Sequence, residues 1–206
     1  MARAGGNTYH HGNLRAALVD AALPLLARHG AADLSLREVA KAAGVSNAAP
    51  YRHFPNRIAL LEAIAAQGFA RLIRVCSEAE RRFPSDPKRQ LVEAGMGYLG
   101  FAVEQPQSIQ LMFGGVLDLR HCGGELKQAA DAAILSLMHI IETGRKAGIY
   151  RRVKAMNLLV TAWSTIHGYT MLVSAGMLRD LAGSPQQVQV LGKEISRTLL
   201  SGMLKR

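Results

Sequence analysis

Apolar residues recur along most of this chain at intervals of three and four positions, the spacing that one face of an α-helix requires. No stretch keeps up the alternation of apolar and polar residues that predicts a β-strand. Glycine and proline separate the periodic stretches and mark where helices should begin and end. The pattern predicts an all-α fold of about nine helices, at residues 13–29, 35–42, 46–53, 56–82, 87–104, 107–118, 125–147, 153–178 and 186–204.

Helix length divides the chain into two parts. The first three predicted helices are short and follow one another closely, whereas the later ones are longer and richer in Leu, Met and Ala. The long helix predicted over 56–82 would connect the two parts. We therefore expect a small N-terminal domain at residues 1–57, in which residues 1–12 form a basic arm, and a larger helical domain at residues 58–206.

The second and third predicted helices have the capping and turn residues of a helix-turn-helix. Ser35 stands three residues before Glu38, the arrangement of a capping box at a helix N-terminus. Gly44 follows this helix, where a positive φ angle allows a sharp turn, and Ser46 is placed to cap the next helix. In a helix-turn-helix the second helix lies in the major groove of DNA.

The stretch "GVSNAAPYRHF", residues 44–54, suits that position. The major groove is about 12 Å wide, so small residues at the leading end of a helix help it to enter. Ala48 and Ala49 allow this close approach and can touch a thymine methyl group, while Asn47 can bond to the edge of an adenine.

The second half of this stretch combines hydrogen-bond donors with an apolar anchor. Tyr51, Arg52 and His53 would reach phosphates or bases, and Phe54 would hold the helix on its own core. Pro50, at the fourth helical position, removes about one intrahelical hydrogen bond. In the alternative interpretation Tyr51 and Phe54 are ordinary core aromatics beside a solvated basic face. The capped turn that precedes them favours contact with DNA.

Composition and charge support a folded protein that binds a polyanion. The 206 residues are 49% hydrophobic and 19% charged, which argues against disorder. The formal net charge of +10 suits nucleic acid or an acidic membrane. Residues 1–57 hold a basic excess and most of the histidines, so the small domain is the better candidate for polyanion contact.

The cysteines and the longest uncharged stretch indicate in which cellular compartment the protein works and whether it enters a membrane. Cys76 and Cys122 are far apart and have no zinc-site spacing, which fits a reducing, cytoplasmic compartment without a disulfide framework or metal; a redox-sensing pair is the alternative. The N-terminus lacks the apolar run of a signal peptide. Residues 155–178 carry no formal charge, but their Asn, Ser, Thr and His residues favour a buried helix over a membrane span. We therefore expect no membrane partner.

The stretch "LSLREVAKAAGVSNAAPYRHFPNRIALLEAI" at residues 34–64, with "LLARHG" before it, resembles the DNA-binding domain of the tetracycline-repressor (TetR) family of bacterial transcriptional regulators. The resemblance spans residues 13–64 and implies that the helix near 46–53 reads DNA. Pro50 departs from the family, which more often has Leu there, and this affects the start and tilt of that helix. The resemblance also implies residues at or near phosphate contacts: Ser35, Arg37, Ser46, Tyr51, His53 and Arg57.

The family resemblance implies that the C-terminal region binds a small effector and dimerises through its last two long helices. The residues agree with dimerisation, because Ser164 and Gly168 lie four apart and permit close helix approach. The alternative is a single monomeric core, but two DNA half-sites favour a two-fold homodimer. An apolar stripe on the last helix completes the expected interface: Val188, Leu191, Ile195 and Leu199.

The stretch "WSTIHG", residues 163–168, resembles a Trp-x3-His-Gly signature found in one subset of TetR C-terminal domains. We expect residues of this helix and of 98–118 and 134–142 to line an effector pocket. In the alternative interpretation His167 is a structural hydrogen-bond partner and the methionines and aromatics fill an ordinary core. The pocket candidates are Tyr98, Phe101, Met112, Phe113, Met138, Trp163, His167 and Met171.

These observations predict a ligand-responsive transcriptional repressor without a cofactor or enzymatic activity. It would bind a palindromic operator in double-stranded DNA as a homodimer and be released by a small-molecule effector. A TetR-type activator needs the same DNA contacts and is one alternative. A DNA-modifying enzyme such as a recombinase, or a small-molecule enzyme using His167 or His139, is another. The acidic residues are scattered, however, and no HExxH, GxSxG or phosphate-binding Gly loop appears.

Overall fold

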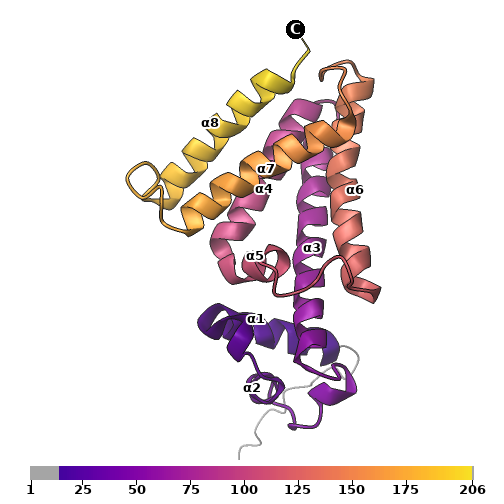
Figure 1. Ribbon diagram of the computed structural model, residues 1–206, viewed down its shortest axis with the longest axis vertical. Helices are drawn as coiled ribbons and strands as arrows, with labels where there is room; N and C mark the ends of the chain where they lie inside the picture. Colours follow the sequence, from indigo (N-terminus) through magenta and orange to yellow (C-terminus); the bar gives the residue numbers. More distant parts are fainter. Residues whose placement is uncertain (1–13, 206) are drawn as a thin grey trace, which may run out of the picture. The chain divides into compact units, whose positions relative to one another are not determined.

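The structure is a computed structural model that describes residues 14–205, so the expected basic arm at 1–12 lies outside the described residues. Within that range the chain forms eight α-helices and one 3-10 helix and no strand, which confirms the all-α fold. None of these helices is both long and apolar enough to span a bilayer. The elements, labelled as in Figure 1, are α1 (Leu14–Asp33), α2 (Leu36–Ala42), η1 (Pro50–Arg52), α3 (Arg57–Arg82), α4 (Pro87–Glu104), α5 (Pro106–Phe113), α6 (Gly124–Lys146), α7 (Ala155–Ser174) and α8 (Pro185–Met203).

The chain divides into two compact units. The first ends at Ile64 and the second begins at Ala65, so the division falls inside α3. Helix α3 is thus shared by the two units, and its first two turns belong with the short elements that precede it. The second unit contains the rest of α3 and the five later helices.

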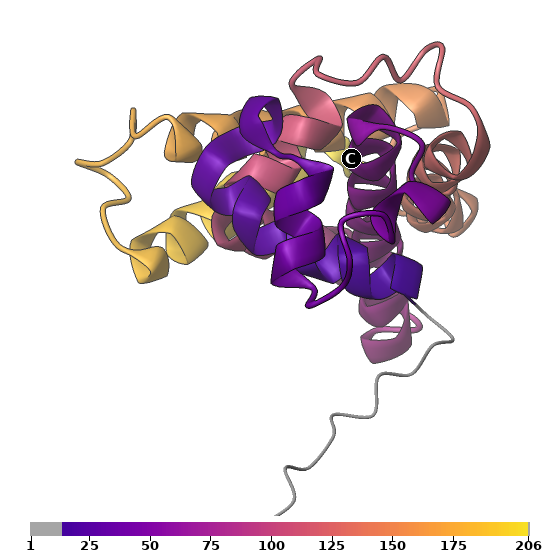
Figure 2. The same ribbon diagram turned by 90° about the horizontal axis from the view of Figure 1, so that it is seen from below.

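The first unit is built around a small apolar core. Its buried side chains come from α1, from α2, from Phe54 after η1 and from the start of α3, and Figure 2 shows these indigo and purple elements gathered together. Gly30, with φ of 74° and ψ of 177°, breaks the regular helix of α1 where the sequence predicts its end. The core side chains are Leu18, Leu26, Val39, Phe54 and Leu60.

The predicted α-helix over 46–53 is wrong in its type and in its start. The Ala49 N–H donates to the Ser46 carbonyl at 3.0 Å, which makes a turn, and a single 3-10 turn follows from Pro50. The physical reason is Pro50, because its nitrogen has no hydrogen for an i to i−4 bond and its ring clashes with the preceding turn of an α-helix. Pro50 therefore begins the helical turn instead of interrupting one.

The second unit is organised around α4, which packs against α6, α7 and α8. One apolar cluster includes Ile140, Ile141 and Leu159, and it encloses Tyr150, whose hydroxyl donates to the Pro87 carbonyl at 2.9 Å. Gly144 on α6 faces this ring so closely that a Cβ there would stand 2.2 Å from Tyr150 Cε2. The absence of a side chain at Gly144 is what lets the tyrosine ring lie this close to α6.

Two helices of the second unit are shorter than the sequence predicts. Helix α5 ends at Phe113 instead of continuing to 118, because Gly114 and Gly115 follow and Gly115 has φ of 78°. An extended connection over 114–123 then leads to α6, and it is visible as the pink coil in Figure 2. Helix α7 likewise ends at Ser174, just before Gly176 with φ of 71°.

Candidate DNA-contact surface and ligand cavity

Helix α2, which precedes the turn to η1, is held by hydrogen bonds at both of its ends. At the N-terminus, Ser35 Oγ accepts from the Glu38 N–H at 3.2 Å and donates to the Glu38 carboxylate at 2.8 Å. At the C-terminus, the Gly44 N–H bonds to the Lys41 carbonyl at 3.2 Å and the Val45 N–H to the Ala40 carbonyl at 3.0 Å, with φ of 69° at Gly44. This is a Schellman motif, and it determines the direction in which the chain leaves α2.

The segment of residues 46–53 presents its polar side chains to solvent. Pro50 is buried and Phe54 is 1% exposed, with the Arg15 guanidinium 5.3 Å from the centre of its ring. Tyr51 is 51% exposed, although it is an aromatic residue three positions from that buried ring. The structure thus brings six of the sequence-predicted DNA-contact residues onto one exposed segment: Ser46, Asn47, Ala48, Tyr51, Arg52 and His53.

The other predicted DNA-contact residues have different surroundings. Arg37 is exposed on α2, and Ala49 is partly buried behind the segment. Ser35 is partly buried and engaged in its cap. The Arg57 guanidinium donates to the carbonyls of Ala31 and Ala32, so this side chain ties the start of α3 to the end of α1.

The second unit contains a partly open cavity of about 250 Å³, lined by residues of α3, α4, α5, α6, α7 and α8. Three of the predicted pocket residues line it, namely Tyr98, Phe113 and Trp163. The Phe113 ring stacks edge-on against Trp163, with centroids 5.7 Å apart, and against His167 at 5.2 Å. These rings therefore form one continuous aromatic wall that also includes Phe69, 5.6 Å from Phe113.

Tyr98 and His167 form the central polar pair of this region. Tyr98 Oη and His167 Nδ1 are 2.6 Å apart, which is a short hydrogen bond between α4 and α7. Burial lowers the pKa of His167, because the charged imidazolium would lose its hydration. Burial also raises the pKa of the Tyr98 hydroxyl above its ordinary value. Both groups are therefore neutral near pH 7.

Five predicted pocket residues lie outside the lining, and His167 is one of them although it bonds to Tyr98. Phe101 is buried, and the Arg71 guanidinium lies 4.5 Å from the centre of the Phe101 ring. Met112 packs against Gly68. Met138 packs against the apolar cluster around Tyr150. Met171 is 42% exposed near the end of α7. Helical spacing places Met171 one turn after His167, but α7 has by then passed the cavity.

Sequence reasoning missed most of the apolar lining. Cys76, Leu91 and Leu200 come from three helices outside the stretches expected to line the pocket, and each has the spacing of an ordinary core residue. Burial raises the pKa of the Cys76 thiol to about 12, so the thiol is uncharged. No sequence signal separates these residues from other buried apolar residues.

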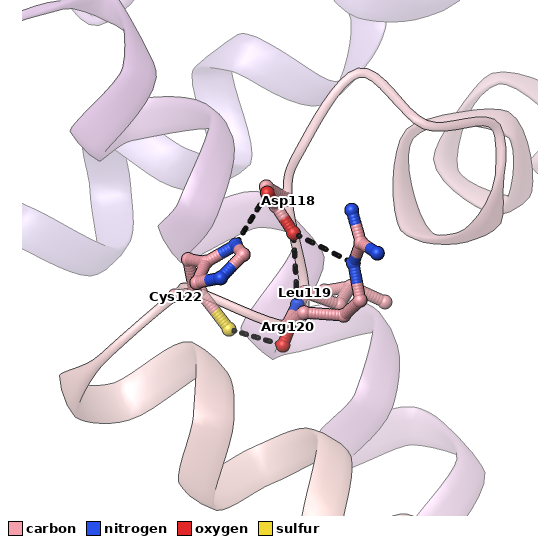
Figure 3. Close-up of polar contacts among 5 residues, drawn as sticks. Asp118, Leu119, Arg120 and Cys122 are labelled. Atoms are coloured by element: carbon pink, nitrogen blue, oxygen red, sulfur yellow. Dashed lines mark hydrogen bonds and ion pairs between the residues drawn. The ribbon is translucent and has the colours of Figure 1, made fainter.

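The connection over 114–123 adds Leu119 to the lining, which the predicted helix over 107–118 does not anticipate. Asp118 holds this connection in place (Figure 3). Its carboxylate accepts from the Arg120 N–H at 3.1 Å and bonds to His121 Nδ1 at 2.8 Å. The Cys122 thiol donates to the Leu119 carbonyl at 3.2 Å. Leu119 is thereby positioned by its own neighbours in the chain.

Helices α7 and α8 pack against each other, and a surface hollow of about 740 Å³ runs along them. Leu191, Ile195 and Leu199 of the predicted interface line this hollow. Ser164 is exposed and Gly168 partly so. Val188 differs from the expectation of an outward stripe, because its side chain is 5% exposed and its carbonyl accepts from the Tyr169 hydroxyl. It packs within the chain.

Residues that could hold a metal ion do not gather in the part of the chain that the structure describes, residues 14–205. No group of three or more His, Cys, Asp or Glu side chains has the required proximity there.

Two family models match this chain. Residues 18–64 match the family described as "Bacterial regulatory proteins, tetR family". Residues 91–191 match the "Tetracyclin repressor-like, C-terminal domain". The first match covers α2, the turn and η1, and the second covers most of the helices around the cavity.

Individual relatives agree with these matches. The chain is 33% identical to "HTH-type transcriptional regulator AcrR" of Shigella flexneri over 95 residues. This match spans 46% of the chain and only 44% of that protein. A Rhodococcus sp. RHA1 protein of unknown function is 32% identical, with a TM-score of 0.81 over 97% of this chain and 100% of that one. The FadR regulator of Bacillus subtilis, solved with stearoyl-CoA, shares the fold at 19% identity and a TM-score of 0.68, over 91% of this chain and 98% of that one.

Proposed function

Because the chain belongs to the TetR family of bacterial transcriptional regulators, we propose that it is a ligand-responsive repressor that binds a palindromic operator as a homodimer. It has the DNA-binding and ligand-binding domains of that family. The observation that carries the proposal is the exposed segment 46–53, held by the buried Pro50 and Phe54 behind it. A rigid, narrow, outward-facing segment is what entry into a DNA groove requires.

Each side chain of this segment has a role in the proposed complex. Asn47 reads a base edge, and Ala48 lies close to the bases because it has no bulk to exclude them. Tyr51, Arg52 and His53 contact phosphates, which position the protein on the duplex without reading sequence. The 3-10 turn is narrower than an α-helix of the same residues, because it winds about three residues per turn, and a narrower segment enters a groove more easily.

Release from DNA is the second half of the proposal. A small molecule in the cavity of the second unit selects a conformation whose two DNA-binding units are wrongly spaced for adjacent half-sites. The aromatic wall and the neutral Tyr98–His167 pair support this cavity as the effector site, because ligand sites combine apolar surface with a few polar groups.

Selection of bound sequences from random duplexes at low ionic strength tests the DNA-binding proposal. We expect a palindrome with half-sites about one helical turn apart and an affinity that falls steeply with salt. Transcription in vitro from a promoter that overlaps this sequence should fall when the protein is added. A rise in transcription would identify an activator, and a failure to bind any duplex would contradict the proposal.

A further inference from the structure

We propose that the cavity binds a small, uncharged and mostly apolar molecule that carries a hydroxyl group, and that this hydroxyl bonds to Tyr98. The inference rests on the proposed function only in treating this cavity as the effector site. Three observations support it, namely the charge of the lining, the size of the cavity and the hydrogen bond that the lining residue Tyr98 makes to His167, which lies outside the lining.

The lining carries no compensating charge for an ionised ligand. None of the described residues that line it is Lys, Arg or His. The single carboxylate in the lining, that of Asp131, is half exposed and already bonded to Lys127 at 2.8 Å. A ligand carboxylate or phosphate would lose its hydration here without gaining a cation, and a ligand cation would meet an anion that is already paired. The cavity therefore favours neutral molecules.

The volume limits the size of the ligand. At about 250 Å³ the cavity is slightly smaller than the range of roughly 300–1,000 Å³ that is usual for drug-sized ligands. The walls are apolar side chains and aromatic rings, including Phe69, Phe113 and Trp163, which contact a hydrocarbon body without needing any polar group on it. A compact ring system or a short branched chain fits this space.

The hydroxyl follows from the Tyr98–His167 hydrogen bond. If the Tyr98 O–H donates to His167 Nδ1, the tyrosine oxygen keeps a lone pair that can accept a hydrogen bond. If His167 carries the proton on Nδ1 and donates to the tyrosine oxygen, the Tyr98 O–H is left as a donor. A ligand hydroxyl both donates and accepts, so it pairs with either tautomer, whereas a ketone or an ether pairs with only one.

The other polar groups of the lining are less suited to this role. The Ser196 hydroxyl donates to the Gly192 carbonyl at 2.8 Å, within α8. The Cys76 thiol is a weak donor, and burial keeps it uncharged. The Trp163 indole N–H is a donor only, so it adds a second bond to a ligand oxygen but cannot choose a hydroxyl over a carbonyl.

A matched series of compounds tests the inference by the fluorescence of Trp163, the only tryptophan of the chain. The series is 4-tert-butylcyclohexanol, tert-butylcyclohexane and 4-tert-butylcyclohexanecarboxylate, titrated at pH 8 into the full-length protein without DNA. We expect saturable binding of the alcohol, binding of the hydrocarbon that is about three- to tenfold weaker, and binding of the carboxylate at least about 30-fold weaker. The inference is overturned if the carboxylate matches the alcohol or if the alcohol does not bind.

Two conservative variants test whether the ligand hydroxyl bonds to Tyr98. Tyr98→Phe should weaken alcohol binding about three- to tenfold and leave hydrocarbon binding unchanged, which also shows that the cavity is intact. Tyr150→Phe removes a buried hydroxyl bonded to Pro87, outside the lining, and should change neither affinity. Equal alcohol affinity in Tyr98→Phe and the unsubstituted protein would overturn the inference.

The titration separates this inference from the proposed function. If the alcohol binds with the expected pattern but a preformed DNA complex survives its addition, the proposed ligand release is wrong and the ligand class stands. If the protein binds its operator but none of the three compounds, the ligand class is wrong and the DNA-binding function stands.

Discussion

At the scale of single residues, the segment 46–53 separates side chains that face solvent from side chains that hold the segment in place. Pro50 and Phe54 are buried, while Asn47 lies three residues before Pro50 and is exposed, and Tyr51 lies three residues before Phe54 and is exposed. An exposed aromatic side chain on a rigid turn costs hydrophobic burial. Tyr51 keeps 51% of its surface exposed, which supports a role for this side chain in contact with a partner.

Substitution of these two exposed residues should have different consequences for DNA binding. Tyr51→Ala should weaken binding to all duplexes by a similar factor, because a phosphate contact carries no sequence information. Asn47→Ala should relax the preference at one base pair per half-site, with a loss of about 1–3 kcal/mol there. Footprinting and competition with sequence variants measure both effects.

The matched control for this pair is Lys146→Ala, which removes an exposed cation from the second unit and should leave binding nearly unchanged. Equal losses for Asn47→Ala and Tyr51→Ala on every sequence would show that Asn47 does not read a base.

At the residue scale the sequence was a better guide to the first unit than to the cavity. The exposure of Asn47, Arg52 and His53 follows from a local motif whose turn and anchors lie within ten residues. Membership of the cavity lining depends on which side chains of five separate helices meet. Tyr98 and Met171 each lie at a position that the helical pattern of apolar residues predicts to face the interior. Tyr98 lines the cavity, whereas Met171 is exposed.

At the scale of elements, the packing of α6 against the connection that follows it depends on a residue without a side chain. Gly144 on α6 is buried against the Tyr150 ring, which its hydrogen bond to Pro87 keeps in position. Such a contact leaves no room for even one methyl group, because protein interiors are close-packed.

Gly144→Ala should therefore destabilise the protein although alanine favours helix. A Cβ would stand 2.2 Å from the Tyr150 ring, so the ring or α6 must shift, and we expect a net loss of about 1–2 kcal/mol in the free energy of unfolding. Urea unfolding followed by circular dichroism measures this change.

Gly100→Ala is the matched control, since Gly100 lies inside α4 and a Cβ there meets no atom within 4 Å. This variant should be as stable as the unsubstituted protein or up to about 1 kcal/mol more stable. Similar stability of the two variants would mean that the contact between Gly144 and Tyr150 does not constrain the packing of α6.

The element between residues 46 and 53 shows how one residue changes a helix. Its neighbours have the spacing and the N-terminal serine of an α-helix, and the sequence alone suggested one. Pro50 removes the hydrogen bond that an α-helix would need at that position, and the chain forms a turn followed by η1 instead. The outward direction of the side chains survives this change, because Phe54 still anchors the end of the segment.

At the scale of the whole molecule, α7 presents apolar side chains to solvent. Met156 is 52% exposed, Val160 48% and Leu172 41%, and all three lie on α7 outside the lining of the surface hollow. Exposed apolar side chains in such number on one helix are typical of an association surface. This arrangement supports the proposed homodimer.

We expect light scattering to give twice the mass of one chain at micromolar concentration. Val160→Glu should shift the protein toward the monomer, because a carboxylate in an apolar interface loses hydration without a partner. Val116→Glu is the matched control, since Val116 is also 48% exposed but lies in the connection after α5, and it should leave the dimer intact. A stable monomer of the unsubstituted protein would contradict the proposed two-fold repressor.

The sequence by itself determined the all-α fold, the helix-turn-helix and the family, because helical spacing, the Ser35 cap and the Gly44 turn act between residues that are near in the chain. Tertiary structure alone decided that Tyr98 meets His167 across 69 positions, that Leu119 closes part of a cavity and that Val188 packs inward. These outcomes depend on the distances between helices that are remote in sequence. Those distances are set by the packing of all the side chains together, which no local pattern contains.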